Sequence, residues 1–191
     1  MSWREKGVSP RLVVSPRNVF FVILTLMFIS LSCWSFASPL IASPDEQAHV
    51  LRAYALDHGD LGSATTPPSK VLENVVVPDT LFYSTIYPVC WQTHPEIPAT
   101  CSAPWPTSSA SETTATYVDH YPPLYYFFVG SATYISHQKN GIYLMRLVSS
   151  LMSALMLALS AYSVARWSKR RSLYLGIYVL WFPRCTSSHP Q

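Results

Sequence analysis

The chain has 191 residues, of which 49% are hydrophobic and only 12% are charged, and its formal net charge is +3. Nine of the ten acidic residues lie between Ser43 and Ile142, whereas ten of the thirteen basic residues lie outside that stretch. Because the basic residues flank apolar segments and form no patch, this pattern excludes a nucleic-acid-binding domain and favours an integral membrane protein.

Two uncharged segments are long enough to cross a bilayer, which requires about 20 apolar residues. One lies between Arg17 and Asp45, and the other is Leu147–Ala165. Since a backbone in hydrocarbon has to satisfy its hydrogen bonds internally, we predict transmembrane helices over residues 18–42 and 143–165. A cleaved signal peptide is the alternative for the first helix, but the apolar run exceeds the usual length of about 7–15 residues.

One cluster of basic residues precedes the first predicted helix, and another follows the second. Under the positive-inside rule, residues 1–17 and the loop 166–171 lie in the cytoplasm, and residues 43–142 lie outside. The prediction is therefore a multi-pass protein with a cytoplasmic N-terminus. The basic residues concerned are Arg4, Lys6, Arg11 and Arg17 before the first helix, and Arg166, Lys169, Arg170 and Arg171 after the second.

Two further apolar stretches are too short to span a membrane. Counting residues 122–137 as a span would move the loop 166–171 outside, so we predict a helix lying on or dipping into the outer leaflet. Residues 172–183 begin a third transmembrane helix that is only half long enough. Residues 184–191 have no apolar period. We interpret this end as a truncated or frame-shifted reading frame.

The external loop, residues 43–142, is predicted to be irregular between Thr65 and Thr116, where proline, serine and threonine are frequent. Cys90 and Cys101 both lie there, and a disulfide persists outside the cytoplasm, so we expect them to be bonded. Closing this short loop would stabilise the fold by about 2–3 kcal/mol. The predicted fold class is an all-α integral membrane protein with two transmembrane helices, a truncated third, and juxtamembrane amphipathic helices in a large external loop.

The first end of the loop carries the signals of a helix. Ser43 is a suitable N-cap, and Glu46, three residues later, completes a capping box. The helix is predicted over about residues 44–57, with Gly59 as its terminator.

Asp45, His49 and Arg52 fall on one polar stripe of this helix. We expect the helix to lie flat on the membrane, with the stripe facing water or a cleft. One interpretation is that the acidic first turn only complements the helix dipole. The other is that Asp45 and His49, one turn apart, act as a general base or hold a divalent cation.

The second end of the loop offers another polar group, Asp119 and His120, directly before Tyr121-Pro122-Pro123. A turn followed by an interfacial aromatic belt is the simpler interpretation. The functional interpretation places Asp119 and His120 opposite Asp45 in one site, where Tyr125 and Tyr126 stack on a sugar or line a lipid groove.

Together these ends resemble the N-terminal part of a bacterial membrane-protein family, the domain of unknown function 2142. The resemblance rests on Ser-Pro-Asp-Glu-Gln-Ala-His-x-x-Arg-Ala-Tyr from Ser43, His-Tyr-Pro-Pro-Leu-Tyr-Tyr from His120, and Arg146-Leu147-x-Ser149. The layout is also similar to that of the GT-C glycosyltransferases. Those enzymes have an acidic pair in the first external loop and a Pro-Pro-Leu-x-Tyr segment before the second span.

The resemblance implies that the full-length family transfers a sugar from a polyprenyl-phosphate carrier to an acceptor at the outer face of the bacterial plasma membrane. Asp45 would be the catalytic residue or a ligand of a divalent cation, and Glu46 its catalytic neighbour. Arg146 would meet a lipid phosphate, although an arginine that snorkels to the interface is the simpler interpretation. The other candidate substrate-binding residues are His49, Arg52, Asp119, His120 and Tyr125.

Two functional hypotheses remain open at this point. As a fragment of a transferase, the chain is expected to be inactive alone, because GT-C proteins have many spans. The competing hypothesis is a non-enzymatic envelope membrane protein whose external loop binds partners.

The charge clusters generate a testable topology. In intact cells, an impermeant thiol reagent should not label a cysteine engineered at position 169, because that position lies in the predicted cytoplasmic loop. Cysteines engineered within residues 43–142 should be labelled and serve as the positive control. Labelling at position 169 would refute the two-span topology.

Overall fold

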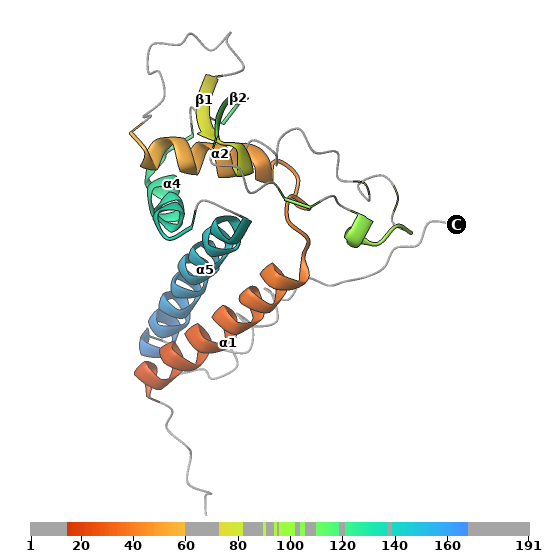
Figure 1. Ribbon diagram of the computed structural model, residues 1–191. Helices are drawn as coiled ribbons and strands as arrows, with labels where there is room; N and C mark the ends of the chain where they lie inside the picture. The colour runs from red at the N-terminus through yellow and green to blue at the C-terminus, as the bar shows by residue number, and fades with distance from the viewer. Residues whose placement is uncertain are drawn as a thin grey trace, which may run out of the picture. The chain divides into compact units, whose positions relative to one another are not determined.

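The computed structural model describes residues 15–59, 73–81, 90, 94, 96–101, 104–105, 110–118, 121–136 and 139–167. In chain order the elements are α1 (Pro16–Ala37), α2 (Glu46–Asp57), β1 (Glu73–Pro78), η1 (Ala99–Cys101), β2 (Ser111–Thr116), α4 (Pro123–Gly130), η2 (Ser131–Tyr134) and α5 (Lys139–Trp167) (Figure 1). The chain divides into two compact units, the terminal unit (Met1–Phe28 with Ser153–Gln191) and the central unit (Ile29–Met152).

α1 and α5 are both long and apolar enough to cross a membrane, with mean hydropathies of 2.2 and 1.8. At about 1.5 Å per residue their lengths are about 33 and 43 Å, against about 30 Å for the hydrocarbon core. α1 ends at Ala37, earlier than the predicted boundary at residue 42. The reason is Pro39, because a residue that precedes proline disfavours helical backbone.

Within the central unit, α2 is a core helix. It packs against α4 and against the β1–β2 sheet (Figure 1). Of the polar stripe that was predicted to face water or a cleft, Asp45 is exposed, His49 is half-buried, and Arg52 is only 3% exposed. The physical reason for this burial is that segments distant in sequence cover both faces of α2. Its buried residues are Ala48, Val50, Leu51, Arg52, Ala53, Ala55 and Leu56.

A two-stranded antiparallel sheet corrects the all-α prediction, although the described residues are mostly helical. β1 pairs with β2 so that Val76 lies opposite Thr113 and Val77 opposite Glu112. Val77 is buried in the core and Val76 is exposed, as the alternation of side chains along a strand requires. The run of valines in β1 and the threonines in β2 have high β-propensity, which explains why this part of the loop is not irregular.

The predicted disulfide is present, joining Cys90 and Cys101 with their Cα atoms 6.2 Å apart. The helix predicted over residues 122–137 is divided into α4 and the short helix η2. The predicted third transmembrane helix, residues 172–183, lies outside the described residues, as does the tail 184–191.

α4 packs on α2 at a position where only glycine fits. A Cβ atom added to Gly130 would overlap the carbonyl oxygen of Ala53 and lie 2.9 Å from the Cβ of Asp57. Backbone of a neighbouring helix cannot move aside as the tip of a flexible side chain can. Gly130 therefore sets the distance between α2 and α4.

We predict that Gly130→Ala lowers the thermal unfolding midpoint of the detergent-solubilised protein, because overpacking typically costs about 1–3 kcal/mol. Ser131→Ala is the matched control. Ser131 is exposed and its hydroxyl bonds only locally, to the carbonyl oxygen of Phe128. Equal midpoints for the two variants would show that α4 does not approach α2 at Gly130.

Candidate functional site

The guanidinium of Arg146 is the centre of a polar network in the central unit. Its Nε donates to Oε1 of Glu46 at 2.6 Å, and Nη2 donates to Oε2 at 2.8 Å. The remaining N–H groups donate at 2.7–2.8 Å to the carbonyl oxygens of Ser35, Ser38 and Pro39. All five donors of an arginine are thereby used. One side chain on α5 thus joins the end of α1 to the start of α2.

The Glu46–Arg146 ion pair changes the roles expected for both residues. Their side chains are only 11% and 13% exposed. The expected contact of Arg146 with a lipid phosphate, and the alternative of snorkelling, are not supported by this geometry, because protein acceptors take every donor. The carboxylate of Glu46 is likewise held by a guanidinium, which makes it a positioning group.

The predicted capping box is wrong, because the carboxylate of Glu46 binds Arg146 and Ser43 is not the N-cap residue. The N-cap of α2 is Asp45, not Ser43, and Asp45 makes no side-chain capping bond. Ser43 contributes its carbonyl oxygen, which accepts from the backbone N–H of Glu46 at 3.2 Å. The predicted C-terminal signal is present at Gly59, whose φ of +92° suits glycine.

Asp45 differs from its neighbour Glu46 in exposure and in hydrogen-bond partner. Its side chain is exposed, and Oδ1 accepts a hydrogen bond from the hydroxyl of Tyr117. That bond, followed by smaller effects of burial and of charge on Asp45 and Tyr121, raises the pKa of Tyr117 to about 12. At neutral pH the phenol therefore keeps its proton and continues to donate to the carboxylate.

His49, the second residue of the predicted stripe, is half-buried against aromatic rings. Its Nδ1 lies 2.7 Å from the hydroxyl of Tyr126, and the two rings are stacked with centroids 5.9 Å apart. The ring of Tyr121 lies at the same distance from His49. Burial, with smaller contributions from Tyr125 and Tyr121 and opposed by the charge of Arg52, raises the pKa of Tyr126 to about 12.

Asp45 therefore contacts Tyr117, directly after β2, and His49 contacts Tyr121 and Tyr126, before and within α4. Sequence periodicity placed Asp45 and His49 on one stripe with Arg52, which is buried. It missed Tyr117, which lies 72 residues from Asp45, and no local pattern could have linked the two. It also expected Tyr126 to stack on a ligand, but this ring is buried against His49.

The remaining candidate residues fall in different places. The hydroxyl of the exposed Tyr125 lies 2.8 Å from that of Ser149, so it joins α4 to α5. Asp119 and His120 lie outside the described residues, and their predicted place opposite Asp45 stays a prediction. Among the residues that the structure does describe, no group of three or more His, Cys, Asp or Glu side chains could hold a metal ion. The divalent cation therefore also stays a prediction.

Comparison with protein families identifies the chain. A family model described as "Predicted membrane protein (DUF2142)" matches residues 28–189, which include Asp45, Glu46 and Arg146. The chain belongs to the DUF2142 family. The resemblance found in the sequence motifs is thus confirmed, and DUF2142 membership together with the apolar helices α1 and α5 indicates contact with a lipid bilayer. No curated protein and no solved structure matches the chain.

We predict that Glu46→Gln strongly destabilises this DUF2142 chain. Breaking a buried ion pair costs about 3–5 kcal/mol, because the remaining charge is left without its partner. Thermal unfolding of the detergent-solubilised protein measures the effect.

The matched control is Glu96→Gln. Glu96 pairs with His94 at 3.0 Å, but their side chains are 67% and 57% exposed. An exposed ion pair contributes about 0–1 kcal/mol, so the midpoint of this variant should be nearly unchanged. If both variants unfold like the wild type, Arg146 does not depend on Glu46.

Proposed function

We propose that this chain carries the acceptor-activating part of a GT-C-like membrane glycosyltransferase. The reaction is transfer of a sugar from a polyprenyl-phosphate carrier to a hydroxyl group at the outer face of the membrane. Asp45 is the general base. The observation that carries the proposal is an exposed carboxylate, Asp45, next to a buried ion pair that fixes its position.

The depth of Asp45 relative to the membrane supports this role. Arg146 directly precedes the uncharged stretch Leu147–Ala165 of α5, and it binds Glu46. The residue beside Glu46 therefore lies near one end of that apolar stretch, at the level of lipid headgroups. A polyprenyl carrier buries its chain in hydrocarbon, so its phosphate is found at the same level. The carboxylate and the phosphate–sugar bond would then meet at one depth.

The chemistry requires one proton acceptor beside the acceptor hydroxyl. As the hydroxyl oxygen attacks the anomeric carbon, the new C–O bond forms and the bond from carbon to the phosphate oxygen breaks. The electron pair of that bond leaves with the carrier phosphate, and the hydroxyl proton passes to Asp45. We assign Oδ2 to the acceptor, because Oδ1 accepts the bond from Tyr117.

Glu46 has a different part in this proposal. Its two oxygens bind Arg146, so it positions the first turn of α2 and takes no proton. Tyr117 donates to Asp45, and the ring of Tyr121 lies 5.9 Å from that of His49, one turn after Asp45. Tyr117 and Tyr121 are exposed aromatic rings, which suit stacking against the apolar face of a sugar.

We predict that Asp45→Asn lowers sugar transfer by about 10²–10⁴-fold, the usual range for loss of a general base. The assay uses membranes containing a longer DUF2142 protein with this segment, a polyprenyl-phosphate sugar as donor, and thiol labelling to verify insertion. Glu112→Gln removes an exposed carboxylate on β2 and should leave transfer unchanged. Full transfer by a correctly inserted Asp45→Asn protein would eliminate Asp45 as the base, whereas a wild-type protein that transfers no sugar would favour the non-enzymatic hypothesis.

A further inference from the structure

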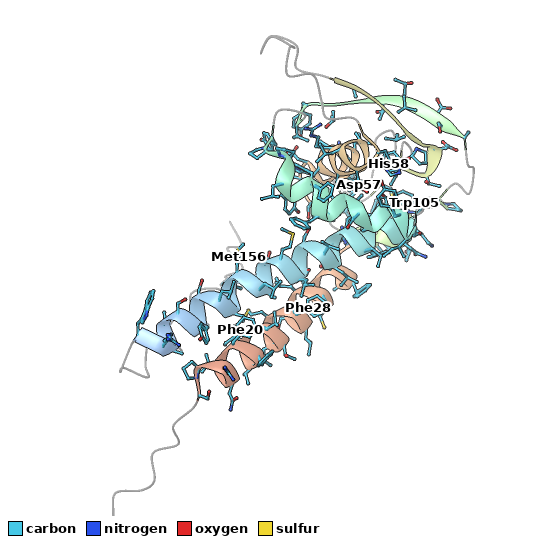
Figure 2. The ribbon with its side chains drawn as sticks, turned by 90° about the vertical axis from the view of Figure 1, so that its left-hand side faces the viewer. Phe20, Phe28, Asp57, His58, Trp105 and Met156 are labelled. Atoms are coloured by element: carbon cyan, nitrogen blue, oxygen red, sulfur yellow. A yellow bond between two sulfur atoms is a disulfide. The ribbon has the colours of Figure 1, made fainter. Side chains whose placement is uncertain are left out.

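The terminal unit contains a groove between the first turns of α1 and the last turns of α5. Its volume is about 410 Å³, and it is lined by Arg17, Phe20, Phe21, Leu159 and Tyr162. Ligand pockets typically measure about 300–1,000 Å³. Figure 2 shows Phe20 on α1, on the side of that helix next to α5. Apolar side chains form the walls, and the polar groups gather at the helix ends.

Arg17 lines the polar end of the groove, and a second guanidinium group, that of Arg166, contacts the lining residue Tyr162. Arg17 lies in the first turn of α1 and is exposed. Arg166, in the last turn of α5, is also exposed and donates at 3.5 Å to the hydroxyl of Tyr162, one turn earlier. The next residue, Trp167, is exposed, and tryptophan is enriched where membrane helices meet the headgroup layer. This end of the groove therefore belongs at a membrane surface.

These cations have no acidic counterpart on the helices that carry them. Neither α1 nor α5 contains aspartate or glutamate, and residues 15–44 and 120–191 contain none at all. A negative charge for Arg17 and Arg166 therefore has to come from outside these segments. Since the walls of the groove are apolar, the anion that fits is one attached to a hydrocarbon chain.

We propose that the groove binds one anionic phospholipid. The phosphate lies between the guanidinium groups of Arg17 and Arg166 and accepts a hydrogen bond from Tyr162, while an acyl chain packs on Phe20, Phe21 and Leu159. Guanidinium groups suit phosphate because they present parallel N–H donors. Basic pockets between transmembrane helices are known binding places for anionic lipid headgroups.

This lipid site is separate from the proposed sugar-transfer site. The groove lies in the terminal unit, and the residues of the proposed sugar-transfer site lie in the central unit. Lipid binding here requires no catalysis by Asp45, so the two proposals can fail independently.

The experiment is native mass spectrometry of the full chain in detergent, titrated with phosphatidylglycerol or phosphatidylcholine. The wild type should retain one phosphatidylglycerol and bind phosphatidylcholine more weakly. Arg17→Gln should weaken phosphatidylglycerol binding about five-fold, the factor for one basic residue near an anionic headgroup. Leu159→Trp should weaken both lipids, because an indole fills the place of the acyl chain.

Two matched controls keep the proposal falsifiable. Lys139→Gln removes one exposed positive charge at the opposite end of α5, and Met156→Trp adds an indole on the side of α5 away from α1 (Figure 2). Both should bind phosphatidylglycerol like the wild type. Equal affinity for the two lipids, or wild-type binding by Arg17→Gln and Leu159→Trp, overturns the proposal. The proposal is also overturned if Leu159→Trp changes the thermal unfolding midpoint and leaves the binding of both lipids unchanged. In that case protein, and not an acyl chain, covers the groove.

Discussion

The central unit depends on the hydrogen bonds of Arg146, whose side chain is only 13% exposed. Moving an ion out of water costs several kcal/mol unless partners replace the lost hydration. Arg146 finds a carboxylate in Glu46 and three carbonyl oxygens where α1 ends. Those carbonyls have no partner further along a helix, and the end of a helix dipole is negative there. Arg146 thus gains acceptors for its N–H groups, and the carbonyl oxygens at the end of α1 gain donors.

Once Arg146 is fixed, the position of α2 follows. Glu46 holds its first turn, and at its other end the hydroxyl of Tyr134 donates to the carbonyl oxygen of Asp57 at 2.7 Å. Also in the first turn, the carbonyl oxygen of Ala48 accepts a 3.1 Å hydrogen bond from the buried hydroxyl of Thr116, which attaches the end of β2. α2 is therefore bound in its first turn by residues of α5 and β2, and at its end by a residue of η2. Tyr117, next to Thr116, is brought to Asp45 as a result.

The sequence was sufficient for features that are local or compositional. A long uncharged run specifies a membrane helix by itself, and two cysteines in one loop specify the disulfide. The partners of α2 could not be predicted, because the residues that bury it come from β1, β2 and α4. Glu46 shows the limit most clearly. Its local pattern indicates a capping box, whereas its partner Arg146 lies 100 residues further along the chain.

The backbone at Asp45 differs from that of an ordinary N-cap residue. An N-cap residue ordinarily has extended backbone angles and a side chain that accepts from the next N–H groups. Asp45 instead has φ 63° and ψ 2°, in the left-handed region that non-glycine residues seldom adopt, and its carboxylate turns to Tyr117. This conformation lets Glu46 point inward to Arg146 while Asp45 stays exposed. Aspartate adopts this region more readily than most residues do, because its short polar side chain can form a local hydrogen bond. At Asp45 the left-handed backbone thus accompanies a contact with Tyr117 in place of a capping bond.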